Sequence, residues 1–111
     1  MGPLELANQY MDVIYGGKLP DLLHEILSKD CRFKGPLYEF NSAAEYIDSL
    51  KTDPPVDVDY ELIEAFENDK SACLVYQFKK ASISTPMTQV FEVVEGKISK
   101  ILLVFDTAGF K

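Results

Sequence analysis

The stretch "GKISKILLVFD", residues 96–106, decides the fold of this chain. It starts with a turn glycine, continues as an apolar run typical of a strand, and ends in the carboxylate of Asp106. A second apolar run at 86–94 precedes it, and Glu95-Gly96 between the two runs is suited to a tight turn. We therefore expect the chain to end in an antiparallel hairpin that carries a charge at its last position.

The turn predicts which residues of this hairpin share a face. If Val93 lies opposite Ile98, the next pairs place Phe91 opposite Lys100, Gln89 opposite Leu102 and Met87 opposite Val104. One face then holds the candidate ligand-binding residues Met87, Gln89, Phe91, Leu102 and Val104 and, beyond them, Asp106. Gln89 and Asp106 would lie about 13 Å apart along the strands, within reach of one ligand.

The opposite face of the hairpin is also too apolar to lie in water. It would hold Val90, Ile101, Leu103 and Phe105. The chain has too little predicted helix to cover both faces, so we expect a second copy to cover this one. The sequence therefore predicts a homodimer built on the outer face of the sheet.

Further out from the hairpin, helical patterns come first and strand patterns follow. We predict helices at 3–15, 20–28 and 42–51, and strands at 31–35, 56–66, 71–80, 86–94 and 97–106. Ser42 and Glu45 form a capping box at the start of the third helix. This order predicts one α+β domain over residues 1–111, with three N-terminal helices on one face of an antiparallel sheet.

Composition limits the partners of the chain. Its 111 residues are 47% hydrophobic, and a net charge of -7 with a single arginine, Arg32, argues against nucleic acid and anionic membrane. Cys31 and Cys73 are far apart, and there is one histidine, so we expect reduced thiols and no metal site. The first residues do not resemble a signal peptide, and no apolar run is long enough to span a membrane. We expect a cytoplasmic protein.

The order of elements and one motif resemble a known family. Gly96, Lys97 and Ile98, followed by Asp106, are similar to the end of the SnoaL-like branch of the nuclear-transport-factor-2-like superfamily. This resemblance implies a cone in which a curved sheet wraps the first helix around a pocket. It implies an acid/base role for Asp106, a polar partner at Gln89, and a match of Tyr10 to the inward tyrosine of the ketosteroid isomerases.

Two positions depart from those isomerases. Where they carry a general-base aspartate before a proline, this chain has Gly35 before Pro36, and Gln89 stands where they have a second acid. The resemblance therefore favours the polyketide-cyclase type of chemistry over the isomerase type.

Each candidate residue has a simpler interpretation as well. Burial in a pocket would raise the pKa of Asp106 toward neutrality, whereas a strand that ends earlier would leave Asp106 in water, capping a turn through the backbone of Ala108. Tyr10 would bond a ligand carbonyl or only pack in the core. The amide of Gln89 needs a partner, which would be ligand, water or backbone.

Two functions follow from these residues. The first is a cofactor-independent lyase or isomerase, in which Asp106 moves a proton on a hydrophobic carbonyl compound that Tyr10 and Gln89 polarise. The alternative is a non-catalytic ligand-binding or dimeric scaffold domain. The remaining tyrosines, Tyr38, Tyr46, Tyr60 and Tyr76, either pack in the core or line the mouth of the pocket.

Overall fold

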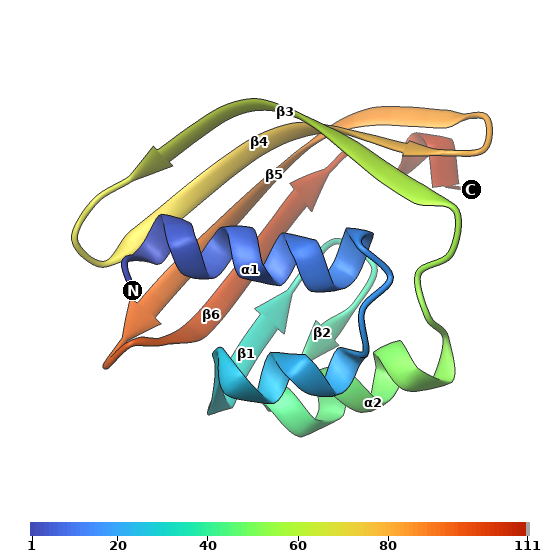
Figure 1. Cartoon of the computed structure of the whole chain (residues 1–111). Helices are drawn as coiled ribbons and strands as arrows, with labels where there is room; N and C mark the ends of the chain where they lie inside the picture. Colours follow the sequence, from blue (N-terminus) through green and yellow to red (C-terminus); the bar gives the residue numbers. More distant parts are fainter. Residues whose placement is uncertain (111) are drawn as a thin grey trace.

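Helix α1 lies across the concave face of a curved sheet, and α2 packs against strand β1 and the short helix η1 (Figure 1). The computed structural model describes residues 1–110, so the last residue of the predicted domain lies outside the described part. The elements are α1 (Pro3–Tyr15), η1 (Pro20–Glu25), β1 (Leu27–Lys34), β2 (Glu39–Phe40), α2 (Ala43–Thr52), β3 (Val58–Glu67), β4 (Ser71–Lys80), β5 (Ile83–Val94), β6 (Lys97–Phe105) and η2 (Thr107–Phe110). The predicted α+β class is confirmed.

The first helix forms as its sequence predicts. Pro3 occupies the first turn, where its missing N–H costs nothing, and Gly16 ends the helix. Leu6, Tyr10 and Met11 recur at helical spacing and are buried against β3, β4 and β5. The helix thus carries Tyr10 into the centre of the domain.

The sheet has the order β2-β1-β6-β5-β4-β3. Strands β3 to β6 form the predicted antiparallel meander. Strand β1 runs parallel to β6, with Phe33 opposite Ile101, so the prediction of an all-antiparallel sheet is wrong for this pair. The chain reaches β1 through η1 at the end of the sheet where β6 also begins, which gives the two strands the same direction (Figure 1).

The second predicted helix is shorter than its leucine pattern indicates. It is a 3-10 helix that ends at Glu25, and β1 begins at Leu27 instead of at residue 31. Leu27 is buried opposite Ile98 of β6, whose backbone N–H donates to the carbonyl of Ile26 at 2.8 Å. Pairing with the sheet therefore overrides the local helical pattern.

A β-bulge changes the register of the final hairpin. Val93 lies opposite Ile98 as predicted, but Ser99 is an extra residue, so Glu92 faces Lys100. Beyond the bulge Gln89 faces Leu103, and the predicted pairing of Gln89 with Leu102 is wrong.

A shift of one residue moves every later side chain of a strand to the other face. Ile101, Leu103 and Phe105 therefore lie on the concave side, facing the helices, where they are buried or half-buried. Leu102, Val104 and Asp106 belong to the outer side. The face predicted for these six residues is thus reversed. Within residues 1–110, no helix is long and apolar enough to cross a membrane.

Candidate functional site

A cavity of about 470 Å³ opens between the two helices and the concave face of the sheet. This volume exceeds the roughly 300 Å³ at which ligand pockets usually begin. Its apolar wall includes Ile14, Phe33, Phe40, Leu50, Val58, Phe78, Ile83, Met87, Leu103, Phe105 and Phe110. The wall is thus formed by side chains from α1, α2, η2 and all the long strands.

Four polar residues gather at the buried end of the cavity, which we call the floor: Tyr10, Tyr46, Tyr76 and Gln89. Tyr76 donates its hydroxyl hydrogen to Oε1 of Gln89 at 2.9 Å, and Nε2 of Gln89 donates to the hydroxyl of Tyr10 at 3.2 Å. The hydroxyls of Tyr10 and Tyr46 bond each other. Tyr10 is only 2% exposed and Gln89 only 3%, so the chain of hydrogen bonds is shielded from water.

Counting hydrogens shows what the floor offers to a ligand. The hydroxyls of Tyr10 and Tyr46 carry two hydrogens, and the bond between them uses one. Tyr10 already accepts from Gln89, and neither hydroxyl donates to a further partner among residues 1–110. Both tyrosines and Gln89 line the cavity, so one phenolic hydrogen and the second amide hydrogen of Gln89 are available to an acceptor placed there.

The phenols of the floor are weak acids. Burial raises the pKa of Tyr10 well above its ordinary value, and the neighbouring Tyr46 raises it further. Burial also raises the pKa values of Tyr46 and Tyr76, against the opposing effect of hydrogen bonds. Burial likewise raises the pKa of Tyr15, whose ring packs edge-on against Tyr76. At neutral pH these groups are therefore neutral hydrogen-bond donors and cannot serve as bases.

The structure brings together three of the predicted site residues. Tyr10, Gln89 and Met87 line the cavity. Phe91 is fully buried behind them, with its ring edge-on to Tyr10 at 5.2 Å between centroids. Phe91 supports the floor without lining the cavity.

The other three predicted residues lie elsewhere because of the bulge. Leu102 and Val104 are on the outer face, where Val104 is 53% exposed. Asp106 is exposed, and its Oδ1 accepts the backbone N–H of Ala108 at 2.9 Å. The prediction that Asp106 points into the pocket is wrong, and the alternative, a turn cap in water, is what the structure shows.

The turn at Asp106 still affects the cavity. It starts η2, whose Phe110 packs on Phe78 at 5.8 Å and on Phe105 at 5.0 Å between ring centroids. Phe110 is part of the cavity wall. The carboxylate therefore acts on the shape of the site through the backbone.

Two residues of the floor, Tyr46 and Tyr76, were predicted only as core or mouth residues. The sequence did indicate that both are buried. Tyr46 follows Ala43 by three residues on α2, so the two share a helix face, and Tyr76 occupies the same face of β4 as Leu74 and Phe78. Burial alone did not show that the hydroxyl of Tyr46 meets that of Tyr10, or that the hydroxyl of Tyr76 meets Gln89. These contacts depend on where the fold places α2 relative to α1 and β4 relative to β5.

Charged groups are sparse in the cavity. Asp53 and Lys80 are the two charged side chains that line it within the described part of the chain, and both lie at its open edge. We call this edge the rim; it also includes the exposed Pro36, Leu37 and Tyr38. No three His, Cys, Asp or Glu side chains of residues 1–110 are grouped as metal ligands would be.

Comparison with solved structures identifies the architecture. A nuclear-transport-factor-2-like protein of unknown function from Cytophaga hutchinsonii superposes with a TM-score of 0.80 at 16% identity, over 95% of this chain and 90% of that one. The chain has the nuclear-transport-factor-2-like fold. No family model matches the sequence, and no curated protein matches it either.

Other proteins with this fold have more specific names. A protein from Jannaschia sp. CCS1 assigned to the SnoaL-like polyketide cyclases superposes with a TM-score of 0.81 at 10% identity, over 96% of this chain and 87% of that one. An epoxide hydrolase of the LEH-like type from M. tuberculosis superposes at 0.75 and 12% identity, over 93% and 81% of the two chains. At such identities the likeness concerns the fold alone.

Two replacements of Asp106 test whether its side chain acts as a turn cap outside the cavity. Asp106→Asn keeps an oxygen that can accept from Ala108, so we expect the free energy of unfolding in urea to stay nearly the same. Asp106→Ala removes the acceptor and should lower it by about 0.5–1 kcal/mol. A loss of ligand binding in Asp106→Asn with stability unchanged would contradict this placement.

The buried phenols predict a loss of stability in alkali. An unfolded chain releases tyrosine protons near pH 10, whereas Tyr10, Tyr15, Tyr46 and Tyr76 keep theirs while folded. The folded state then binds more protons, so stability is complete below pH 10 and falls as the pH rises above it. Phenolate absorbance from these four groups should appear together with the loss of circular dichroism. Their ionisation in a still folded protein would refute this account.

Proposed function

We propose that the protein binds a hydrophobic small molecule that carries a hydrogen-bond acceptor, such as a carbonyl oxygen, in the cavity. The observation that carries this proposal is the spare phenolic hydrogen of the Tyr10–Tyr46 pair at the end of an otherwise apolar cavity. A buried donor without an acceptor costs about 1–3 kcal/mol, so an oxygen placed there is favoured. The apolar wall would bind the rest of the molecule through the hydrophobic effect.

Binding is better supported than proton-transfer catalysis. An isomerase or lyase that works on a carbon next to a carbonyl needs a base near the bound carbonyl. Within residues 1–110 the floor holds only phenols of raised pKa and the amide of Gln89, while Asp53 lies at the rim. Asp106 lies outside the cavity. We therefore prefer the non-catalytic alternative, with Tyr10 and Gln89 as ligand-positioning residues.

A neutral fluorescent ketone tests this function. Propionyl-dimethylaminonaphthalene emits further to the blue in apolar surroundings, and the same molecule without its acyl group is the matched probe lacking the acceptor. We expect the ketone to bind more tightly by up to about tenfold, the value of one hydrogen bond. The measurement is a fluorescence titration of each probe with the protein.

The controls for this experiment follow from the hydrogen count. Either single Phe variant leaves one phenolic hydrogen, so the double variant Tyr10→Phe/Tyr46→Phe is needed to remove both, and we expect it to weaken the preference for the ketone while the amide hydrogens of Gln89 remain. Tyr60→Phe is the matched control, because Tyr60 is half-buried and does not line the cavity. Absence of binding by the wild-type protein, or a preference that is unchanged in the double variant, would count against the proposed function.

A second copy of the chain remains the proposed cover of the outer sheet face. Phe66, Cys73, Val90 and Leu102 lie opposite one another across four neighbouring strands, and we call them the outer apolar row. Phe66 is 58% exposed, because α1 and α2 lie on the other side of the sheet and leave this face uncovered (Figure 1). Such a row is a surface that a self-complementary dimer would bury.

A charge in the outer apolar row should separate the copies. Val90→Glu places a carboxylate in the centre of the row, where burial without a partner is costly. We expect the molar mass from light scattering to fall from that of a dimer to that of a monomer, with binding of the ketone retained. Val56→Glu, in the exposed segment between α2 and β3, is the matched control. A wild-type protein that is monomeric at all concentrations would overturn the dimer.

A cytoplasmic location also stays a prediction. Cys31 and Cys73 are both free thiols, which suits a reducing compartment. Burial, followed by the charge of Asp30, raises the pKa of Cys31 to about 12. The thiol of Cys31 is therefore unreactive at neutral pH. Avoidance of nucleic acid and of anionic membrane remains a prediction from the net charge of -7.

A further inference from the structure

Lys80 is the one basic side chain within residues 1–110 that lines the cavity. On β4, side chains alternate between the two faces, so Lys80 shares the concave face with Tyr76 and Phe78. Lys80 follows Tyr76 by four positions, a distance of about 13 Å along the strand. Lys80 is half-buried and lies at the rim, at the opposite end of the cavity from Tyr76 in the floor.

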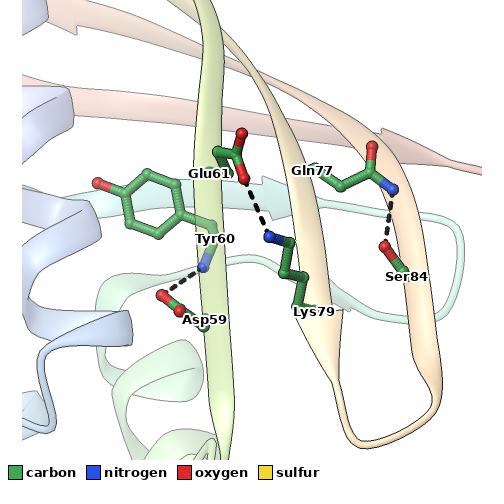
Figure 2. A network of polar contacts seen from close by, with 6 residues as sticks. All are labelled: Asp59, Tyr60, Glu61, Gln77, Lys79 and Ser84. Atoms are coloured by element: carbon green, nitrogen blue, oxygen red, sulfur yellow. Dashed lines mark hydrogen bonds and ion pairs between the residues drawn. The ribbon is translucent and has the colours of Figure 1, made fainter.

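The neighbouring lysine shows the ordinary situation of a surface cation. Lys79 points to the opposite face of β4, and its ammonium pairs with Glu61 of β3 at 3.0 Å (Figure 2). Lys80 takes part in none of the ion pairs or side-chain hydrogen bonds among residues 1–110, which elsewhere join Lys51 to Asp21 and Lys100 to Glu92. The cavity rim thus has an ammonium group that forms no ion pair among the described residues.

One carboxylate could compete for this charge. Asp53 lines the same cavity from the end of α2, but it is exposed and forms no ion pair with Lys80. The other acidic groups give the protein its net charge of -7, and the fields of those more than about 8 Å away are largely screened at physiological salt. Within residues 1–110, Lys80 is the one cationic side chain on the cavity wall that a ligand anion at the rim can contact.

We propose that the ligand is an amphipathic carboxylate, with its acceptor oxygen at the floor, an apolar body along the wall and its carboxylate against Lys80. This inference rests on the proposed function and names the class of ligand. A carboxylate fits better than a phosphate, because no arginine lines the cavity to form a bidentate pair and Lys80 supplies a single point charge. At the rim the carboxylate keeps part of its hydration, which avoids the cost of burying a charge at the floor.

A pair of charged and neutral probes tests the class of ligand. One probe is the acylaminonaphthalene fluorophore with a carboxymethyl group on its nitrogen, at the end remote from the ketone, and the other is its methyl ester. We expect the wild-type protein to bind the carboxylate about fivefold more tightly than the ester, as for a partly exposed ion pair. The preference should shrink as salt is added.

Four variants test whether this preference comes from the rim. Lys80→Met and Lys80→Gln should bind both probes equally, whereas Lys79→Met, which removes the same charge from the outer face, should keep the wild-type preference. Asp53→Asn should strengthen the preference for the carboxylate, because it removes the competing charge. Circular dichroism shows that each variant is folded.

The possible failures are distinguishable. If the ester binds but the carboxylate binds no better, or if Lys80→Met keeps the preference, the ligand class is wrong and the proposed function stands. If the preference is lost in Tyr10→Phe/Tyr46→Phe instead, the carboxylate occupies the floor and the assignment to Lys80 is overturned. If neither probe binds, both the proposed function and this inference fail.

Discussion

The amide of Gln89 is the constraint on which the rest of the site depends. It is the one buried polar side chain, apart from tyrosine, within residues 1–110. An unpaired amide in this position would cost about 1–3 kcal/mol for each lost partner. Its two bonds, from Tyr76 and to Tyr10, satisfy one donor and one acceptor and tie β4, β5 and α1 together. These bonds link the first helix to the sheet at the buried end of the cavity.

This arrangement gives the cavity a polar end without a charge. Phenols whose pKa values are raised by burial remain protonated, so they can orient an oxygen but cannot remove a proton. The charged groups, Asp53 and Lys80, lie at the opposite, open end. Neutral donors inside and charges outside are what a selective binding pocket needs, because the desolvation of a charge is avoided. A site for proton abstraction would require the reverse placement of one carboxylate.

The fold of this chain therefore does not decide its chemistry. Proteins of the same architecture include one assigned to the polyketide cyclases and an epoxide hydrolase. Their sequences are only 10% and 12% identical to this chain. Activity depends on the few side chains that enter the cavity. In this chain those side chains are mainly aromatic or aliphatic, and the polar groups at the buried end are phenols and the amide of Gln89.

Local sequence patterns were enough to predict the class of the fold and the bounds of the first helix. Hydrophobic periodicity and the caps at Pro3 and Gly16 are local signals, which is why the predicted range 3–15 agrees with α1 and why Tyr10 was placed inward. Alternation along β4 and β5 likewise placed Gln89 inside the domain.

The neighbours of these residues depend on contacts between distant parts of the chain. The extra residue Ser99 has no distinctive signature in the sequence, yet it turns Asp106 away from the cavity by reversing the face of β6. The meeting of Tyr10 with Tyr46 joins residues 36 positions apart, and helical periodicity cannot predict which side chains of two helices will meet. Periodicity tells which side of an element is buried, whereas register and packing decide which side chains touch, because those depend on partners far away in the chain.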